Sequence, residues 1–287
     1  MLRDVVRLMR PRDWVKQAFV LMPVPFALAT SAQLQPLRLG LGVLGFCLAS
    51  SAVYAYNDAL DAHLDRLHPT KRNRPVASGR ISPTQARLIA LALECAALLL
   101  GVLSGSLTAV WLMLAYALLN LLYGHLAKHV SLVDVFLLST GFVIRVFLGC
   151  ALMGVQPSNW LLLCSSTLAL FLALTKRRAD LVTGLDERVR PALAAYTTSF
   201  LDQAIGITAG VAILSYALYC LEAAVFQPGR EFASLPFVAF AILDYLRIAH
   251  LENMGGSPVD VIMANLRIPL SVVGWTLAIG WSLGFVV

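Results

Sequence analysis

The chain has 287 residues, of which 59% are hydrophobic and only 13% are charged. A soluble domain carries about 25% charged residues, so the composition excludes an ordinary water-soluble globular protein. Apolar runs of about 20 residues recur along the whole chain, and each is long enough to cross a bilayer as a helix. The sequence therefore predicts one all-α, polytopic membrane domain over residues 1–287.

Nine apolar segments can be placed along the chain. Their ranges are 17–32, 38–57, 86–104, 107–124, 132–153, 159–175, 202–222, 234–250 and 267–287. The first follows basic residues, as a signal peptide does. However, Asp4, Asp13 and Trp14 precede it and eight further segments follow, so we expect a retained helix.

The basic residues predict the orientation of these segments. Of the 22 Lys and Arg residues, 19 lie before the first segment, in the loops that join an even-numbered segment to the next odd-numbered one, or at the segment ends that adjoin those loops. By the positive-inside rule, the N-terminus and these loops face the cytoplasm, and nine spans put the C-terminus outside. We expect an inner-membrane protein whose basic cytoplasmic face, reflected in the net charge of +6, attracts anionic lipids or phosphorylated substrates. The basic loops lack interleaved aromatic residues, so no nucleic-acid surface is expected.

An acidic cluster follows the second segment, in 56-YNDALDAHLDRLHPTKRNRPVASG-79. On a helix, Asp58, Asp61 and Asp65 fall within about 60° of arc and repel one another unless a cation lies among them. Carboxylates without cysteine suit Mg²⁺ or Mn²⁺, and Mg²⁺ commonly combines one or two carboxylates with substrate phosphates. The alternative is a solvated loop of acid–base pairs. The position directly after a membrane span favours a metal–diphosphate site, with the basic run that follows as its phosphate contacts.

Two later loops repeat the combination of acids and bases. Tyr123, Lys128 and Asp134 follow the fourth segment. Arg145 lies eleven residues after Asp134, on the same helical face but inside the fifth segment. An arginine there must face a polar interior, a partner or a bound anion.

The loop after the sixth segment is 176-KRRADLVTGLDERVRPALAAYT-197. Asp180 and Glu187 would share a helical face there, among five basic residues. This arrangement predicts a weaker second acidic site. The alternative is a solvated amphipathic connector between two spans.

The motif 57-NDALDAHLD-65 is similar to the NDxxDxxxD signature of the UbiA-type intramembrane prenyltransferases. This superfamily has nine helices around a metal–diphosphate cavity that opens to the cytoplasm. HPTKRNRPVASG, 10-RPRDWVKQ-17, 142-FVIRVFLG-149 and 176-KRRADL-181 resemble more closely one branch, the decaprenyl-phosphate phosphoribosyltransferases. That branch makes the arabinose-donor precursor of the mycobacterial cell wall, using phosphoribosyl pyrophosphate as donor and a polyprenyl phosphate as acceptor.

The resemblance implies a role for each matched residue. Asp58, Asp61 and Asp65 would hold Mg²⁺ or Mn²⁺, and Asp58, Asp61, Lys128 and Arg145 would act in catalysis. The candidate substrate contacts are Lys16, Asn57, Lys71, Arg72, Arg74, Tyr123, Asp134, Lys176, Arg177, Asp180 and Tyr196.

Two other functions stay open at this stage. One is a prenyltransferase that moves a prenyl group from its diphosphate to an aromatic acceptor. The other is a transporter of a phosphorylated solute, although charges crowded at one face argue against its midplane site. The oligomeric state also stays open.

Overall fold

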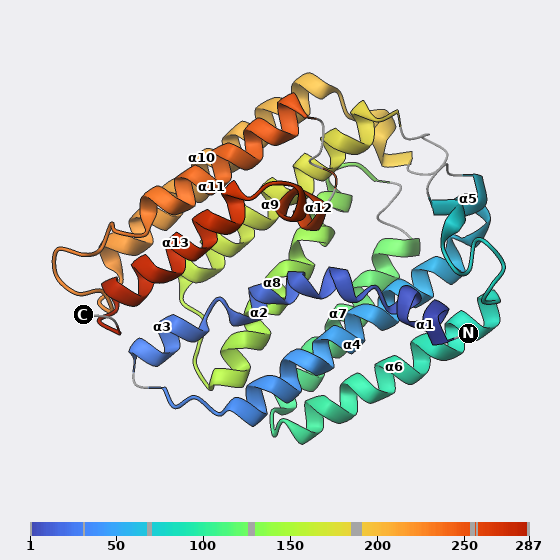
Figure 1. Cartoon of the computed structure of the whole chain (residues 1–287), viewed down its shortest axis with the longest axis horizontal. Coiled ribbons are helices and arrows are strands. Elements are labelled where there is room, and N and C mark those ends of the chain that lie inside the picture. The colour runs from blue at the N-terminus through green and yellow to red at the C-terminus, as the bar shows by residue number, and fades with distance from the viewer. Residues whose placement is uncertain are drawn as a thin grey trace.

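The computed structural model describes residues 2–30, 32–67, 71–125, 130–184, 191–252, 256 and 258–285. Every regular element in these ranges is helical. The elements are α1 (Leu2–Met9), η1 (Pro11–Gln17), α2 (Ala18–Leu21), α3 (Val24–Ala29), α4 (Pro36–Leu60), α5 (Ala62–Leu67), η2 (Lys71–Asn73), α6 (Pro83–Leu103), α7 (Leu107–His125), α8 (Val133–Met153), α9 (Asn159–Val182), η4 (Pro191–Ala195), α10 (Thr198–Glu222), α11 (Leu235–Leu251), α12 (Pro258–Ala264) and α13 (Arg267–Ser282). Figure 1 shows the long helices running side by side as a bundle.

Among these elements, six helices are long and apolar enough to cross a bilayer: α4, α6, α7, α8, α9 and α10. Counting α12 and α13 as one span, bent by 94°, raises the number to seven. The eighth and ninth predicted segments are represented by α11 and α13, which have 17 and 16 residues. The first predicted segment, 17–32, is not one helix. It divides into the end of η1, α2 and α3, because Pro23 and Pro25 lack the N–H that a continuous helix needs.

The helices differ in how much of their surface the protein covers. In α4 and α8, 56% and 61% of the apolar window is buried, against 22% in both α6 and α7. The first two helices therefore form the interior, and the other two present apolar side chains outward. In a membrane protein, polar groups on interior helices are the ones that face partners or ligands.

Close backbone contact fixes the N-terminal segment to the interior. A Cβ atom at Gly149 of α8 would lie 2.0 Å from the carbonyl oxygen of Val20 in α2, so only glycine allows this crossing. The side chain of Gln17, just before α2, reaches both neighbours. It donates to Ser50 Oγ on α4 at 3.0 Å and accepts from Arg145 Nε on α8 at 3.0 Å. The 10–17 motif is thereby placed between α4 and α8.

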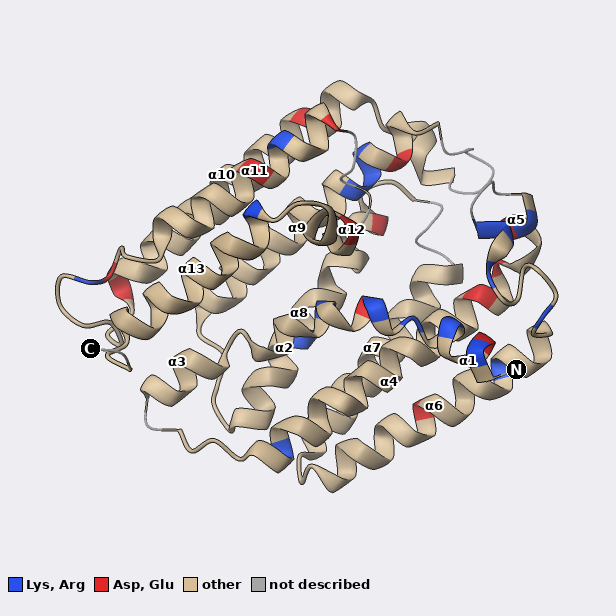
Figure 2. Cartoon of the chain, in the orientation of Figure 1, with Lys and Arg blue, Asp and Glu red and all other residues tan. Residues whose placement is uncertain are grey.

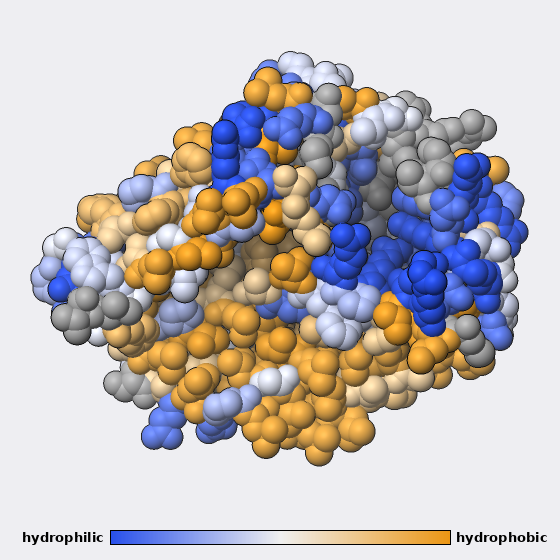
Figure 3. All heavy atoms as spheres, viewed as in Figure 1, coloured by the Kyte–Doolittle hydropathy of each residue, from blue (hydrophilic) through white to orange (hydrophobic). Residues whose placement is uncertain are grey.

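Charged residues are unevenly distributed over the bundle. Figure 2 shows them gathered around α1, α5 and the C-terminal end of α9, whereas the middle and the other end are mostly uncharged. In Figure 3 the same side is hydrophilic, the adjoining surface is apolar, and the face in view is hollowed between α13 and α2. The charged loops after α4 and α9 therefore lie at one end of the molecule.

Candidate functional site

Two of the three predicted metal ligands are buried at the end of α4. The helix ends at Leu60, but the N–H of Asp61 still donates to Asn57 O at 2.8 Å, and that of Asp65 donates to Asp61 O at 2.8 Å. The three aspartates therefore follow nearly one helical path into α5, as the spacing predicts. Asp58 and Asp65 are only 2% and 3% exposed, so both need a cation nearby.

In this structure, two arginines supply that charge. Arg74 Nη1 lies 3.2 Å from Asp58 Oδ1 and 2.7 Å from Asp65 Oδ2, so one nitrogen bridges two carboxylates. Arg10, immediately before η1, pairs with the same Asp58 oxygen. We call these four residues the first cluster. Arg74 was predicted from the sequence, but Arg10 was not. Arg10 lies 46 mostly apolar residues before the acidic motif, and only its place in the 10–17 motif marks it.

The remaining predicted residues of this loop differ in exposure. Lys71 lies on η2 and interacts electrostatically with Asp61 and Asp65. Burial and the neighbouring Arg74 guanidinium lower the pKa of Lys71, although the nearby carboxylates act in the opposite direction. Arg72, also on η2, is exposed. Lys71 therefore faces the acids, and Arg72 lies at the surface.

A second cluster forms where α7, α8 and α9 meet. Arg177 is fully buried and uses three nitrogens: Nε pairs with Asp134 Oδ2, Nη1 with Asp180 Oδ2 at 2.7 Å, and Nη2 with the Tyr123 hydroxyl at 3.0 Å. The Tyr196 hydroxyl donates to the other oxygen of Asp134 at 2.8 Å. All five residues were predicted substrate contacts, and here they bind one another.

Lysine side chains link the two clusters electrostatically. Lys71, from the first loop, interacts electrostatically with Asp180 from the second. Lys176 interacts electrostatically with Asp180 and also with Lys71 and Lys16. Lys16 in turn contacts Asp13 and lies 3.3 Å from the Tyr54 hydroxyl. Lysines from three separate segments are therefore electrostatically coupled near the two clusters, an arrangement suited to a ligand with more than one anionic group.

Arg145 occupies a different environment, deep in α8. It is 3% exposed, and its donors reach Gln17 Oε1, the Gly141 carbonyl and the Tyr116 hydroxyl. Its guanidinium also lies about 5 Å from the ring centroids of Phe46, Tyr116 and Phe142. Oxygens and aromatic faces therefore stabilise this cation, and the described partners include no carboxylate. Of the other predicted residues, Asn57 lies against Gly124 of α7, and Lys128 and Glu187 are outside the described residues.

The donor set fits a divalent cation that is shared with a substrate. Over the ranges given above, no three His, Cys, Asp or Glu side chains converge on one point. Oxygens of Asp58 and Asp65 do converge on a single atom, the Arg74 nitrogen. Two carboxylates complemented by phosphate oxygens are a common Mg²⁺ environment. The residues therefore suit a metal–diphosphate complex better than a cation bound by protein ligands alone.

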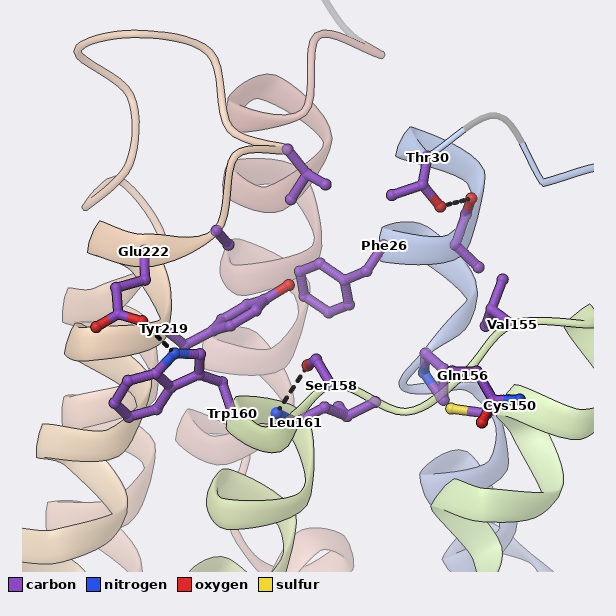
Figure 4. A pocket seen from close by; sticks show the side chains of 14 residues that line it. Phe26, Thr30, Cys150, Val155, Gln156, Ser158, Trp160, Leu161, Tyr219 and Glu222 are labelled. Atoms are coloured by element: carbon purple, nitrogen blue, oxygen red, sulfur yellow. Dashed lines mark hydrogen bonds between the residues drawn. The ribbon is translucent and has the colours of Figure 1, made fainter.

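A cavity of about 310 Å³ lies away from both clusters. It is lined by residues of α3, the end of α8, the start of α9 and the end of α10, including Phe26, Trp160 and Tyr219. Figure 4 shows Trp160 Nε1 donating to Glu222, at 2.7 Å. Cys150, which lines this cavity, lies sixteen residues after Asp134 on α8, a rise of about 24 Å along the helix. It therefore takes no part in chemistry at the two clusters.

The fold and the clusters together define a helical membrane protein with a buried acid–base site for an anionic ligand. A family model, the UbiA prenyltransferase family, matches residues 18–254, and the chain belongs to that family.

Relatives extend this assignment over nearly the whole chain. A decaprenyl-phosphate phosphoribosyltransferase of Corynebacterium glutamicum is 31% identical, with 96% of this chain and 85% of the relative covered. The Mycobacterium tuberculosis enzyme of the same name is also 31% identical, with coverages of 98% and 94%. A UbiA homolog from Archaeoglobus fulgidus, whose structure contains GPP and Mg²⁺, superposes with a TM-score of 0.71 at 18% identity. It covers 95% of this chain and 99% of its own.

Proposed function

We propose that this protein transfers the 5-phosphoribosyl group of phosphoribosyl pyrophosphate to a polyprenyl phosphate, decaprenyl phosphate in the first instance, and releases pyrophosphate. The observation that carries the proposal is the electrostatic coupling of Lys176 to Lys16 and Lys71, lysines of three separate segments near the two clusters. Phosphoribosyl pyrophosphate has anions at both ends, a diphosphate and a 5-phosphate, so its site needs cations on two sides. A prenyl diphosphate has one anionic end and one apolar tail.

The relatives support the same choice of donor and acceptor. The Corynebacterium glutamicum and Mycobacterium tuberculosis relatives, matched over 85% and 94% of their own length, carry the name decaprenyl-phosphate phosphoribosyltransferase. Family membership alone would favour the second candidate, a prenyl group transferred to an aromatic acceptor. That reaction must remove a proton from the acceptor, whereas a phosphate oxygen is already anionic and attacks without a general base.

Binding of the donor would involve the aspartates and Arg74 of the first loop together with the three lysines. Asp58, Asp61 and Asp65 would hold a divalent cation, Mg²⁺ or Mn²⁺, which when bound neutralises charge on the leaving pyrophosphate. Lys71 and Arg74 would bind the diphosphate from one side, and Lys176 and Lys16 would bind the 5-phosphate from the other. Arg72, which is exposed on η2, would contact the donor from the protein surface.

The second cluster would position these groups. Arg177 holds Asp180 and Tyr123 in place through its own hydrogen bonds, and Tyr196 orients Asp134. In the reaction, a phosphate oxygen of the lipid forms a bond to C1 of the ribose as the bond from C1 to pyrophosphate breaks. Cations fixed around the leaving group stabilise the negative charge that develops there. Arg145 would add positive charge deeper in α8, and Lys128 and Asn57 complete the proposed set.

The proposal includes the topology. Nine membrane crossings would place the N-terminus and both clusters at the cytoplasm and the C-terminus outside. This arrangement is supported by the 19 basic residues on one side of the predicted spans and by the gathering of charge at one end of the bundle (Figure 2). The lipid acceptor would then enter from the membrane, with its phosphate at the same end.

The test offers two labelled donors to the purified protein in detergent with Mg²⁺. Phosphoribosyl pyrophosphate labelled in the ribose is supplied with decaprenyl phosphate, and a labelled prenyl diphosphate is supplied separately with an aromatic acid. We expect label in the lipid fraction only from the first pair, and none with Asp58→Asn. Transfer from the prenyl donor alone would reject this function and support the second candidate.

A further inference from the structure

The segment around Arg10 is fixed to α4 on both sides. Ser51 and Asp58 lie seven residues apart on one face of that helix. The Trp14 indole N–H donates to Ser51 Oγ at 3.0 Å, and the same hydroxyl oxygen lies 2.8 Å from the Met9 carbonyl oxygen. Arg10 stands between Met9 and Trp14 in the chain, so these contacts place it beside Asp58.

The backbone of Arg10 is strained in this position. Its φ of 52° and ψ of 61° lie in the left-handed region, which residues other than glycine adopt uncommonly. Such a conformation persists where surrounding contacts determine it, and it occurs often at functional sites. The strain directs the guanidinium over the Tyr54 ring, 4.9 Å from its centroid, and onto Asp58.

The charges around Asp58 restrict what can bind there. Arg10 and Arg74 both reach the same oxygen of this buried carboxylate, and a guanidinium does not lose its proton in a protein. A divalent cation at Asp58 would therefore lie close to two positive groups and be repelled by them. A diphosphate bound beside that cation would instead attract both arginines. Arg10 keeps 25% of its side chain exposed, so it can turn toward such a ligand.

We infer that Arg10 exchanges partners during donor binding: it pairs with Asp58 before the donor arrives, and it binds the diphosphate once Asp58 holds the divalent cation. The inference rests on the proposed function and names a donor-binding residue for it. The metal frees Arg10 from Asp58, and the diphosphate draws the arginine's positive charge away from the metal. Metal and diphosphate therefore bind cooperatively, and each raises the affinity for the other by the same factor. The protein thereby avoids holding the metal in the absence of its substrate.

The test measures metal binding rather than turnover. Mn²⁺ is titrated into the purified full-length protein by equilibrium dialysis, and protein-bound Mn²⁺ is measured with and without pyrophosphate; dialysis without protein corrects for the complex that Mn²⁺ and pyrophosphate form in solution. For the wild type we expect Mn²⁺ affinity to rise when pyrophosphate is present. For Arg10→Gln we expect affinity without pyrophosphate to rise about threefold or more and affinity with pyrophosphate to fall about tenfold, since one charge-assisted contact is lost.

Arg12→Gln is the matched control. Arg12 is exposed, two residues away, and its nearest described partner is the Met263 sulfur at 3.6 Å, so this variant should follow the wild type. Arg10→Lys keeps the positive charge without the planar fork of donors. We expect it to leave affinity without pyrophosphate low and to weaken only binding with pyrophosphate, which decides the matter if Arg10→Gln does not fold.

Two results would overturn the inference in distinguishable ways. If the wild type binds Mn²⁺ in neither condition, the proposed metal–diphosphate function fails and the exchange fails with it. If the wild type binds Mn²⁺ and both Arg10 variants match it in both conditions, the exchange alone is wrong and the proposed function stands.

Discussion

The two clusters use the same residue types in opposite ways. In the first, Arg10 and Arg74 keep 25% and 29% of their side chains exposed, and both share one oxygen of Asp58. In the second, Arg177 and Asp134 are both 0% exposed, and every nitrogen of the guanidinium and both oxygens of the carboxylate have a partner within the protein. Partly exposed cations with shared partners can move to a ligand, whereas a closed buried network cannot do so without leaving a charge unpaired.

This difference separates binding from positioning. An arginine beside an aspartate is therefore insufficient to identify a phosphate contact. The exposure of the guanidinium, and the number of its N–H donors without a protein partner, decide whether it can bind a phosphate. The comparison predicts that substitutions in the first cluster change catalysis and binding, and that substitutions in the second change stability.

The largest effect is expected for Asp58→Asn, which removes a charged oxygen at the centre of the first cluster. Turnover should fall by at least about a thousandfold, because a hard cation loses a ligand and the leaving group loses its neutralisation. The rate of phosphoribosyl transfer measures this, with detergent gel filtration to confirm the fold. Asp4→Asn is the control, because it removes only the surface pair with Arg80 and should keep near-normal activity.

Arg177→Met should mainly affect the fold. It leaves Asp134 buried without its cation, and breaking a buried pair in this way lowers the free energy of unfolding by about 3–5 kcal/mol. Thermal or denaturant unfolding in detergent measures the loss, and Arg74→Met provides the matched substitution in the first cluster. A stable Arg177→Met protein that has lost only donor binding would contradict the division between the clusters.

Much of the first cluster could be predicted from the sequence. The i, i+3, i+7 spacing of Asp58, Asp61 and Asp65 depends only on helical geometry, and the helix does continue almost without a break. The prediction of one helix over 17–32 was wrong, because it rested on hydropathy and gave too little weight to Pro23 and Pro25, near which the chain forms separate short helices.

The contacts between distant segments could not be predicted in this way. Arg10 meets Asp58 only because Gly149 lets α2 cross α8 and Ser51 holds the preceding turn against α4. Arg177 was predicted to bind phosphate, yet its hydrogen bonds to Asp134 and Tyr123 arise from the packing of three helices. Spacing along one helix fixes a face, but it does not determine what another segment places opposite that face.

Arg74→Gln should have a smaller effect, and one confined to the donor. The KM for phosphoribosyl pyrophosphate should rise about tenfold to a hundredfold, because one charge-assisted contact is lost. The free energy of unfolding should change little, since Arg10 still pairs with Asp58 and Lys71 still interacts electrostatically with Asp65. Steady-state kinetics and unfolding of the same preparation test both statements. A large loss of stability here would show that the first cluster is as closed as the second.

The smallest effect concerns the pH dependence of the first cluster, through Lys71. Burial and the adjacent Arg74 lower the pKa of Lys71 below its ordinary value of 10.5. In the interval between the lowered and the ordinary pKa, the unfolded chain binds more protons than the folded one, so this group makes the fold more stable as pH rises. Donor binding responds in the opposite direction, because the lysine loses its charge as pH rises through the lowered pKa. We expect kcat/KM for phosphoribosyl pyrophosphate to fall up to about tenfold on the alkaline side. Lys71→Arg, which stays charged, should remove that decline, and an unchanged decline in this variant would assign it to another group.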